Sequence, residues 1–241
     1  MPVRPTFSVV IPACDEERYL PACLAGIERA AARLDEPVEV VVADNMSRDG
    51  TAAMARERGA AVVSVEEKCL SVVRNRGAAA ATGRYLVFID ADSIMSDGML
   101  VTLKDVLDSG RYIGGGVAHV RPDRLSLGIL CSILCFAPFA IWRIRASAVV
   151  FYTTPEAFNE LGGFDERLYA VEDIDFANRM RALGKRRGLR YKNLLRAYVT
   201  TSTRKFDEFG DWFVLRHPIR VWKAFRNDRE VAHDLWYRPR R

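Results

Sequence analysis

The stretch Arg84-Tyr-Leu-Val-Phe-Ile-Asp-Ala-Asp92 decides how this chain is interpreted. Residues 85–89 are apolar and rich in β-branched and aromatic side chains, which is typical of a buried strand. Two carboxylates, Asp90 and Asp92, follow this strand directly. Ionised acids so close together repel each other and resist desolvation, and a bound cation removes both penalties. The alternative is an aspartate that caps a helix beside a solvated turn.

The residues before this stretch alternate between two hydrophobic periodicities. They predict strands at 7–11, 38–43 and 61–65, the first of them ended by Pro12, and helices at 18–34, 51–58 and 70–81. This alternation predicts an α/β fold, a mostly parallel, Rossmann-like sheet flanked by helices on both faces. Ligands of such sheets bind beyond the carboxyl ends of the strands, where Asp90 and Asp92 are expected.

The pattern changes after residue 93. We expect helices at 97–107 and 171–183, and a strand at 112–120 in which Gly114-Gly115-Gly116 marks a bend or a close backbone approach. Residues 125–142 are nearly uncharged and apolar. A buried core helix is the favoured interpretation of this segment and a helix in a membrane interface is the second. A membrane span is the least favoured, because it needs about 20 apolar residues.

Charge is distributed unevenly along the 241 residues. Residues 1–178 hold 18 Lys and Arg against 25 Asp and Glu, whereas residues 179–241 hold 18 against 6. The basic part is expected to face an anionic partner such as a phospholipid or a diphosphate. Nucleic acid is not expected as a partner, because no recognition motif and no interleaving of aromatic and basic residues occurs.

The five cysteines are odd in number and include no Cys-x-x-Cys pair. This argues against a disulfide framework or a structural zinc site and fits a reducing cytosol. No basic-then-apolar leader is seen at the start of the sequence. We therefore expect a cytoplasmic protein, located at the inner face of the membrane if residues 125–142 contact lipid.

Four further motifs accompany Asp90 and Asp92, and their order carries more information than any one of them. The motifs are Ile11-Pro-Ala-Cys-Asp-Glu-Glu17, Ala43-Asp-Asn-Met-Ser-Arg-Asp-Gly-Thr51, Gly162-Gly-Phe-Asp165 and Val171-Glu-Asp-Ile-Asp-Phe176. In this order they resemble the family 2 glycosyltransferases, which have the GT-A fold. The resemblance covers roughly residues 6–205. It implies an inverting transfer of a sugar from a nucleotide-diphosphate sugar to the hydroxyl of a glycan or lipid-linked acceptor.

The resemblance also implies how the chain is organised. A single GT-A domain is expected at 1–205, with a nucleotide-binding half at about 6–93 and an acceptor half at about 94–205. A basic helical C-terminal extension is expected at 206–241. The oligomeric state is left open.

In the family, the first two strand ends hold the nucleotide. By resemblance, Pro12, Cys14 and Glu16 would lie along the base and ribose, and Asp44 would accept a hydrogen bond from the base. An ionised carboxylate suits this role because it is acceptor-only. A turn cap is the alternative for Asp44. The family commonly carries Asp-Asp-Gly-Ser where this chain has Asp44-Asn-Met-Ser47, so the identity of the base stays open.

Arg74 lies on the predicted helix 70–81, in a region that helps to position the nucleotide in the family. A solvated helix face is the alternative for this residue. Farther along the chain, Thr201-Ser-Thr-Arg-Lys-Phe206 looks like a short motif of bacterial members. There Arg204 and Lys205 could contact the diphosphate once a loop closes over it.

The residues Asp90, Ala91 and Asp92 would line the donor, with Asp90 near the ribose and the metal and Asp92 coordinating Mg²⁺ or Mn²⁺. Such a cation stabilises the negative charge that develops on the departing nucleoside diphosphate. His217 is a candidate for a further metal ligand, since some GT-A enzymes use a late histidine. A surface or packing role is the favoured interpretation of this lone histidine.

Glu172 and Asp173 begin the predicted helix at 171–183. The resemblance implies that Asp173 removes the proton from the acceptor hydroxyl. Glu172 is the less favoured candidate for this base, and its other expected role is to orient the acceptor or the neighbouring Asp173. The alternative is structural, because carboxylates are stabilised at a helix N-terminus.

Two other functions stay open at this stage. A sugar nucleotidyltransferase is less favoured because the loop at residues 12–17 is acidic and would repel a triphosphate. A non-catalytic module that binds an anion or a nucleotide would need neither Asp92 nor Asp173.

Overall fold

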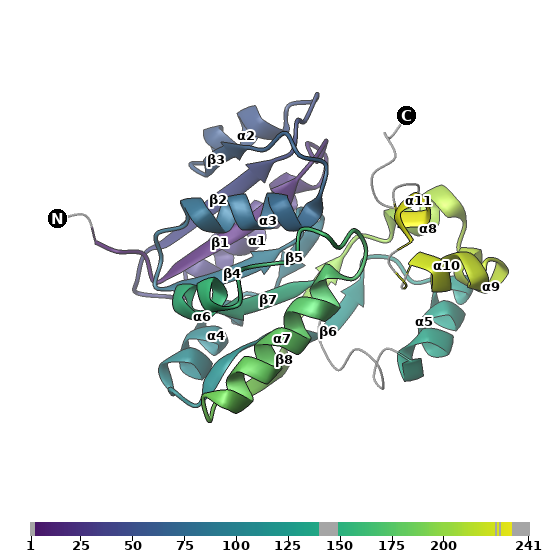
Figure 1. Ribbon diagram of the computed structural model, residues 1–241. Coiled ribbons are helices and arrows are strands. Elements are labelled where there is room, and N and C mark those ends of the chain that lie inside the picture. The colour runs from purple at the N-terminus through teal and green to yellow at the C-terminus, as the bar shows by residue number, and fades with distance from the viewer. Residues whose placement is uncertain (1–2, 140–148, 225, 227, 233–241) are drawn as a thin grey trace.

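The protein is described here by a computed structural model that covers residues 3–139, 149–224, 226 and 228–232 (Figure 1). One sheet of eight strands, in the order β3-β2-β1-β4-β7-β6-β8-β5, forms its centre. The strands are β1 (Phe7–Ala13), β2 (Val38–Asp44), β3 (Ala61–Ser64), β4 (Tyr85–Ile89), β5 (Ser93–Met95), β6 (Tyr112–Pro122), β7 (Val150–Thr153) and β8 (Arg190–Thr201). Helices flank the sheet on both faces, as the alternating periodicity predicts.

In the N-terminal half, β1 pairs in parallel with β2 and β4, and β2 pairs in parallel with β3. The connecting helices are α1 (Leu20–Ala31), α2 (Thr51–Glu57), α3 (Leu70–Ala80) and α4 (Met99–Asp108). The carboxyl ends of the four parallel strands therefore meet at one edge. The strands and helices expected in this half are confirmed, with ends that differ by up to three residues.

Pro12 was expected to end the first strand, and this prediction is wrong because β1 continues to Ala13. The register explains why the proline is tolerated. Pairing of β1 with β4 stops at Val10 and Phe88, whereas pairing with β2 continues to Ala13 and Asp44. Pro12 thus lies where the strand has only one neighbour, and proline is accepted in sheets at such edges.

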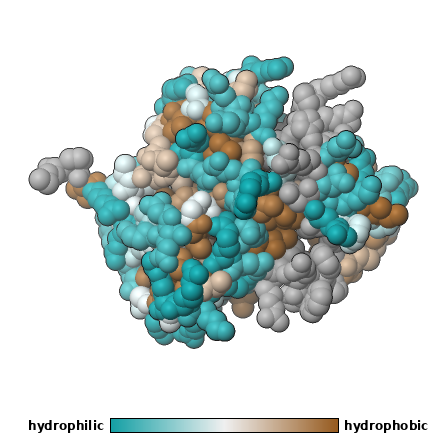
Figure 2. All heavy atoms as spheres, in the orientation of Figure 1, coloured by the Kyte–Doolittle hydropathy of each residue, from teal (hydrophilic) through white to brown (hydrophobic). Residues whose placement is uncertain are grey.

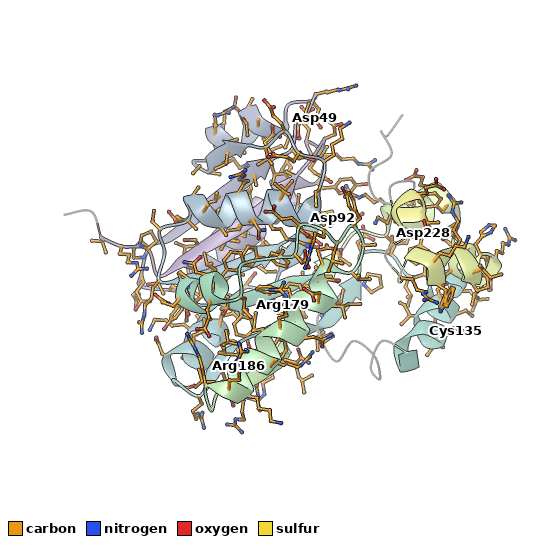
Figure 3. The ribbon with its side chains drawn as sticks, in the orientation of Figure 1. Asp49, Asp92, Cys135, Arg179, Arg186 and Asp228 are labelled. Carbon is orange, nitrogen blue, oxygen red and sulfur yellow. The ribbon has the colours of Figure 1, made fainter. Side chains whose placement is uncertain are left out.

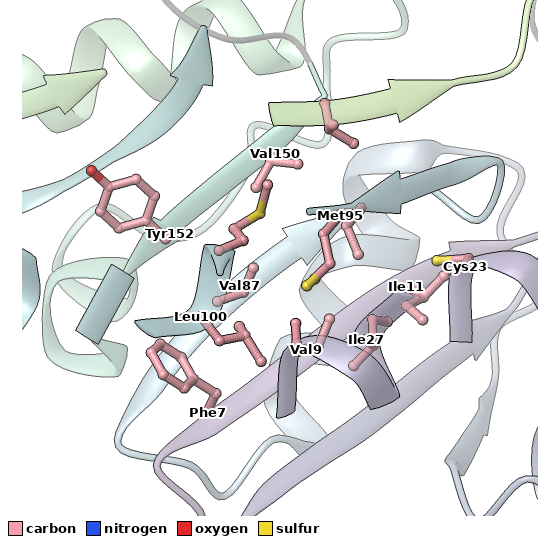
Figure 4. Close-up of a cluster of buried hydrophobic side chains, with 14 of the residues drawn as sticks. Phe7, Val9, Ile11, Cys23, Ile27, Val87, Met95, Leu100, Val150 and Tyr152 are labelled. Carbon is pink, nitrogen blue, oxygen red and sulfur yellow. The ribbon is translucent and has the colours of Figure 1, made fainter. Parts of the chain in front are cut away.

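Alternate residues of β1 supply two separate hydrophobic cores. Phe7, Val9 and Ile11 are fully buried against α1 and α4, together with Val87 and Met95 (Figure 4). The opposite face packs against α6 (Pro155–Glu160) and α7 (Glu172–Arg186), and its core is largely aromatic. Its buried rings are Phe88, Phe151, Phe158, Phe164 and Phe176. The stacked pair Phe164 and Phe176, with ring centroids 4.2 Å apart, fixes the start of α7 close to the sheet.

The C-terminal half of the sheet is mixed. β7 is antiparallel to β4 and β6, β5 is antiparallel to β8, and β6 runs parallel to β8. The sequence does not predict strand β8, because the strand is mostly polar and carries Arg190, Lys192 and Arg196. The glycines of β6 mark a close approach, as expected, because a Cβ atom at Gly115 would meet the carbonyl oxygen of Lys192.

A group of helices lies beside the end of the sheet at which β6 and β8 project (Figure 1). It consists of α5 (Leu127–Phe139), α8 (Arg204–Phe209), α9 (Phe213–Arg216), α10 (Pro218–Ala224) and α11 (Arg229–Ala232). The buried core helix favoured for residues 125–142 is wrong, because Leu127 and Leu134 of α5 are 69% and 63% exposed. Residues 140–142 of that segment lie outside the described residues. Among the helices that the structure describes, none is long and apolar enough to cross a membrane.

Candidate active site

Two loops at the carboxyl edge of the sheet are tied to each other. The loop after β1 and the loop after β2 exchange hydrogen bonds: Asp15 N–H donates to Ser47 Oγ at 3.0 Å, and Arg48 N–H donates to Asp15 Oδ1 at 2.7 Å. Asp15 and Met46 have φ angles of 54° and 56°, a region that residues other than glycine rarely adopt. Such backbone strain persists where surrounding contacts hold it, and it clusters at functional sites.

Asp44, the last residue of β2, lies at the base of these loops and is only 6% exposed. Within the described part of the chain, no donor reaches its buried Oδ1 atom. The adjacent Asn45 is held by bonds from its Nδ2 to the carbonyl oxygens of Val65 and Glu67, at 2.8 and 3.0 Å. A buried acceptor without a donor is costly to a folded protein. The site is therefore suited to a ligand that brings a donor to Asp44.

Arg74 connects acids from opposite sides of the site. Its side chain is 4% exposed, and its guanidinium bonds Asp90 Oδ1 through Nη2 at 2.9 Å and Glu172 Oε1 through Nη1 at 2.8 Å. Helix α3 reaches this position because Gly77 lets it lie against β1, where a Cβ atom would collide with Val10. The alternative of a solvated helix face is thus wrong for Arg74. Burial lowers the pKa of this guanidinium, but the two carboxylates outweigh burial and raise it.

Arg204 makes a second bridge, between loops that are far apart in the sequence. Its Nη2 atom lies 2.7 Å from Glu16 Oε1 and 3.1 Å from Asp92 Oδ2, and its Nη1 bonds the other oxygen of Glu16. Asp123 fixes the start of α8 by accepting bonds from Thr203 N–H and Oγ1–H at 2.9 and 2.7 Å. The guanidinium therefore supplies positive charge at the carboxylate predicted to bind a cation.

Asp92 lies at the centre of the site, between the strand ends of the sheet and the group of helices that carries Cys135 and Asp228 (Figure 3). Its side chain is 15% exposed. Burial raises the pKa of Asp92 to about 6, and Asp90 and Glu16 add to this rise, while the charge of Arg204 opposes it. A cation bound at Asp92 would relieve the same desolvation and repulsion.

Asp173 stands at the start of α7, next to Glu172. Its Oδ1 accepts a hydrogen bond from Ile174 N–H at 2.7 Å. Burial raises the pKa of Asp173 to about 7, and the charge of Glu172 adds to this effect, whereas Arg74 lowers the pKa. A carboxylate whose pKa is close to neutrality is well matched to proton abstraction from an alcohol.

Asn75 is a further residue of the site that sequence analysis did not single out. Its Nδ2 donates to Phe164 O at 2.9 Å and to Glu166 Oε1 at 3.0 Å, and its Oδ1 accepts from Phe164 N–H at 2.9 Å. A Cβ atom at Gly163 would collide with Asn75. The Gly162-Gly163 pair is the sequence signal for this tight approach, but it does not reveal the partner. Asn75 thus holds the loop that leads into α7 against the helix that carries Arg74.

The remaining predicted residues are distributed as follows. Pro12 and Ala91 are buried beside the strand ends, and Cys14 is exposed at the surface of the first loop. His217 is exposed between α9 and α10, with its ring 5.2 Å from that of Phe213. Within the described residues, no three His, Cys, Asp or Glu side chains gather closely enough to hold a metal ion. The structure therefore does not bring His217 together with Asp90 and Asp92, and its packing against Phe213 fits the favoured packing role.

The two aspartates nevertheless fit a divalent cation. Mg²⁺ sites typically use one or two carboxylates, and substrate phosphates and water complete the coordination. Asp92 Oδ1 contacts Ser93 Oγ at 3.3 Å, and its other oxygen is paired with Arg204. Such a donor set suits a cation that arrives with a diphosphate and is shared between the diphosphate and the protein.

Comparison with known proteins identifies the family. The model of glycosyl transferase family 2 matches residues 8–129, which include the loops after β1 and β2, Arg74 and the Asp90-Ala91-Asp92 motif. The chain belongs to glycosyl transferase family 2. An uncharacterized glycosyltransferase of Mycobacterium tuberculosis is 38% identical over 103 residues, which cover 43% of this chain and 44% of the relative. The dolichyl-phosphate beta-glucosyltransferase of Drosophila melanogaster is 32% identical over 143 residues, which cover 49% of this chain and 43% of the relative.

Solved structures support the fold of this family 2 chain. A mannosyltransferase from Pyrobaculum calidifontis, in complex with GDP-Man and Mn²⁺, superimposes with a TM-score of 0.62 at 17% identity. The match covers 97% of this chain and 74% of that protein. The expected GT-A architecture is thereby confirmed. The chain spans less than half the length of the relatives that it matches by sequence.

Proposed function

We propose that this protein is an inverting glycosyltransferase that moves a sugar from a nucleotide-diphosphate sugar to an acceptor hydroxyl. One observation carries the proposal. Asp90 and Glu172, separated by more than 80 residues, are bridged by one buried guanidinium at the carboxyl edge of the sheet. An acid of the donor motif and an acid beside the candidate base Asp173 thus share one site.

The donor would occupy the edge at which β1, β2 and β4 end, in the nucleotide-binding half at about 6–93. Asp44 supports this position, because its Oδ1 lacks a donor within the described residues and a nucleobase N–H can supply one. Glu16 and Cys14 belong to the neighbouring loop, in which the positive φ angle of Asp15 indicates a strained backbone. The diphosphate would then lie toward Asp92 and Arg204.

Asp92, assisted by Asp90, would hold Mg²⁺ or Mn²⁺ against the diphosphate. A cation there supplies positive charge that stabilises the departing nucleoside diphosphate. Arg204 pairs with Glu16 and Asp92. If its guanidinium donated hydrogen bonds to phosphate oxygens instead, both acids would be released from this pairing. The Mn²⁺ in the complex of the Pyrobaculum enzyme agrees with such a site in a protein of the same fold.

Asp173 would take the proton from the acceptor hydroxyl, in the acceptor half at about 94–205. Its raised pKa supports this role, because the carboxylate is basic enough to share a proton with an attacking alcohol. Glu172 stays paired with Arg74 and would keep Asp173 in place. Attack from the face opposite the diphosphate inverts the anomeric centre.

The acceptor is proposed to be a lipid-linked or glycan hydroxyl, used by a cytoplasmic protein at a membrane face. The dolichyl-phosphate beta-glucosyltransferase, to judge by its name, acts on a lipid-linked phosphate, and it matches 49% of this chain. The exposed leucines of α5 supply a second reason to expect a lipid environment.

A screen of nucleotide sugars by thermal shift, with and without Mn²⁺, tests the donor part of the proposal. A ligand that binds only the folded state raises the melting temperature, so one nucleotide sugar should do so and Mn²⁺ should enlarge the rise. Asp173→Asn should retain this shift but lose transfer, whereas Asp92→Asn should lose the Mn²⁺ effect. Release of inorganic diphosphate in place of a nucleoside diphosphate would contradict the reaction class. Retained anomeric configuration in the product would contradict the stereochemistry.

A further inference from the structure

The helices α9 and α10 carry a regular stripe of exposed apolar side chains. Its members are Trp212, Leu215, Ile219 and Trp222, which are 39%, 37%, 71% and 53% exposed. Trp212 is the residue before α9, and His217 separates α9 from α10, so the four side chains come from two consecutive short helices. Water is an unfavourable environment for four large apolar side chains exposed within eleven residues, so the stripe indicates a binding partner.

Basic residues follow three of the four members of this stripe. Arg216, Arg220 and Lys223 follow Leu215, Ile219 and Trp222 directly in the sequence. No acidic residue occurs between positions 212 and 224. The Arg226 guanidinium lies over the ring of Trp222, 4.8 Å from its centroid. Interleaved apolar and cationic side chains are typical of helices that lie in the interface of an anionic membrane.

Helix α5 supplies a second exposed apolar stripe. Leu127, Leu130 and Leu134 are exposed at helical spacing, whereas Ile129 and Ser132, on the other side of the helix, are buried. The only polar side chain of α5 is that of Ser132, whose hydroxyl donates to Gly128 O within the same helix. A helix that is apolar all round needs a non-aqueous environment on every side.

The two stripes belong to one body. Arg124, which precedes α5, bonds Asp207 of α8 at 2.6 Å and Asp211, between α8 and α9, at 2.8 Å. Gly128 packs so closely on Asp211 that a Cβ atom would lie 2.8 Å from its carbonyl oxygen. Arg124 thus offsets part of the negative charge of two acids, Asp207 and Asp211, that lie beside the stripes. Figure 2 shows hydrophobic residues on the visible side of this group of helices, set among hydrophilic ones.

We propose that the stripes of α5 and α9–α10 dock this protein on the headgroup region of an anionic lipid bilayer. The inference rests on the proposed function and adds to it the place where the acceptor is met. Because α8 links the docking helices to Arg204, a bilayer that carries the acceptor lipid would lie beside Asp92. The leucines, Ile219 and Trp222 enter the interface, and Arg216 and Lys223 meet lipid phosphates.

The full chain is tested by cosedimentation with two kinds of vesicle at physiological salt, phosphatidylcholine alone and phosphatidylcholine with phosphatidylglycerol. The wild type should bind the anionic vesicles, with a blue shift of tryptophan emission that Trp222→Phe reduces. Ile219→Ser with Trp222→Ser should weaken binding by roughly tenfold or more. Arg216→Gln with Lys223→Gln should weaken binding to the anionic vesicles by about thirtyfold, because two attractions are lost.

Lys185→Gln with Arg186→Gln is the matched control, since it removes two exposed charges at the end of α7 farthest from these helices (Figure 3). It should change vesicle binding by less than about twofold. The proposal is overturned if this control weakens vesicle binding as much as Arg216→Gln with Lys223→Gln does. It is also overturned if Ile219→Ser with Trp222→Ser binds vesicles like the wild type, or if the wild type does not bind vesicles. A wild-type dimer that Ile219→Ser with Trp222→Ser disperses would assign the surface to a second copy. The thermal-shift screen measures nucleotide binding without vesicles, so a failure of the proposed function can be told apart from a failure of membrane docking.

Discussion

Replacing Arg74 with methionine tests whether its guanidinium joins the two halves of the site. The side chain is 4% exposed and bonds Asp90 and Glu172 at 2.9 and 2.8 Å. Methionine keeps the length and the apolar contacts of the stem but removes the charge. Removing one partner of a buried ion pair typically costs about 3–5 kcal/mol, because the other charges stay buried and unpaired. For a chain of this size the melting temperature should fall by roughly 10 °C.

The loss should depend on pH in a defined direction. Arg74 lowers the pKa of the neighbouring Asp173, which burial raises to about 7, so without the guanidinium this pKa should rise further above its value in the unfolded chain. The folded state then binds more protons than the unfolded state, so its stability increases as pH falls. The deficit relative to wild type should be full above neutral pH and smaller near pH 5, and Glu172→Gln added to Arg74→Met should recover part of it.

Urea unfolding at pH 5 and pH 8 measures these differences, with Arg76→Met as the control. Arg76 lies on the same helix, but its side chain is 61% exposed and its contact with Glu67 is 3.5 Å long. Its replacement should cost at most about 0.5 kcal/mol. Equal losses in the two variants, or a deficit in Arg74→Met that grows as pH falls, would refute the account of a buried bridge between two carboxylates.

Three further predictions follow from the site. Asp44→Ala should weaken binding of the best nucleoside diphosphate by about 10- to 150-fold, as expected for a lost hydrogen bond to a charged group. The melting temperature should not fall. Unchanged affinity in a calorimetric titration would show that Asp44 is not part of the nucleotide site. Because the pKa of Asp173 is raised to about 7 and a base must be deprotonated, kcat/KM should rise about tenfold per pH unit below pH 7 and level off above it; an acid limb near pH 4 would argue against this base. Arg204→Gln should tighten binding of Mn²⁺ alone, because Asp92 loses its competing cation, and weaken binding of Mn²⁺ with nucleotide; weaker binding of Mn²⁺ alone would contradict the competition.

Local patterns in the sequence were sufficient to predict the N-terminal half of the fold. The buried run at 85–89 is strand β4, and the acids that follow it stand at the carboxyl edge of the sheet. The period of the apolar residues marks each parallel strand and each covering helix, because one face or stripe of each element must be buried. β8 carries little such signal, since exposed basic residues occupy much of the strand.

The partners of the charged residues could not be predicted from spacing. Arg204 meets Glu16 across 188 positions of sequence, and Arg74 meets Glu172 across 98. The choice between a solvated and a buried Arg74 depends on Gly77, whose missing side chain brings α3 close to β1. For α5, composition predicts an apolar environment, but the sequence does not tell which side of the helix the protein covers. The structure covers Ile129 and leaves Leu127 and Leu134 exposed.

Anomalous scattering from crystals grown with Mn²⁺ and a nucleoside diphosphate tests most directly whether one cleft gathers these acids. The account predicts a manganese peak within bonding distance of the Asp92 carboxylate. The nucleobase should lie against Asp44, and Asp173 should face the open side of the diphosphate. A manganese peak away from Asp92, or a nucleotide bound outside the ends of β1, β2 and β4, would contradict it.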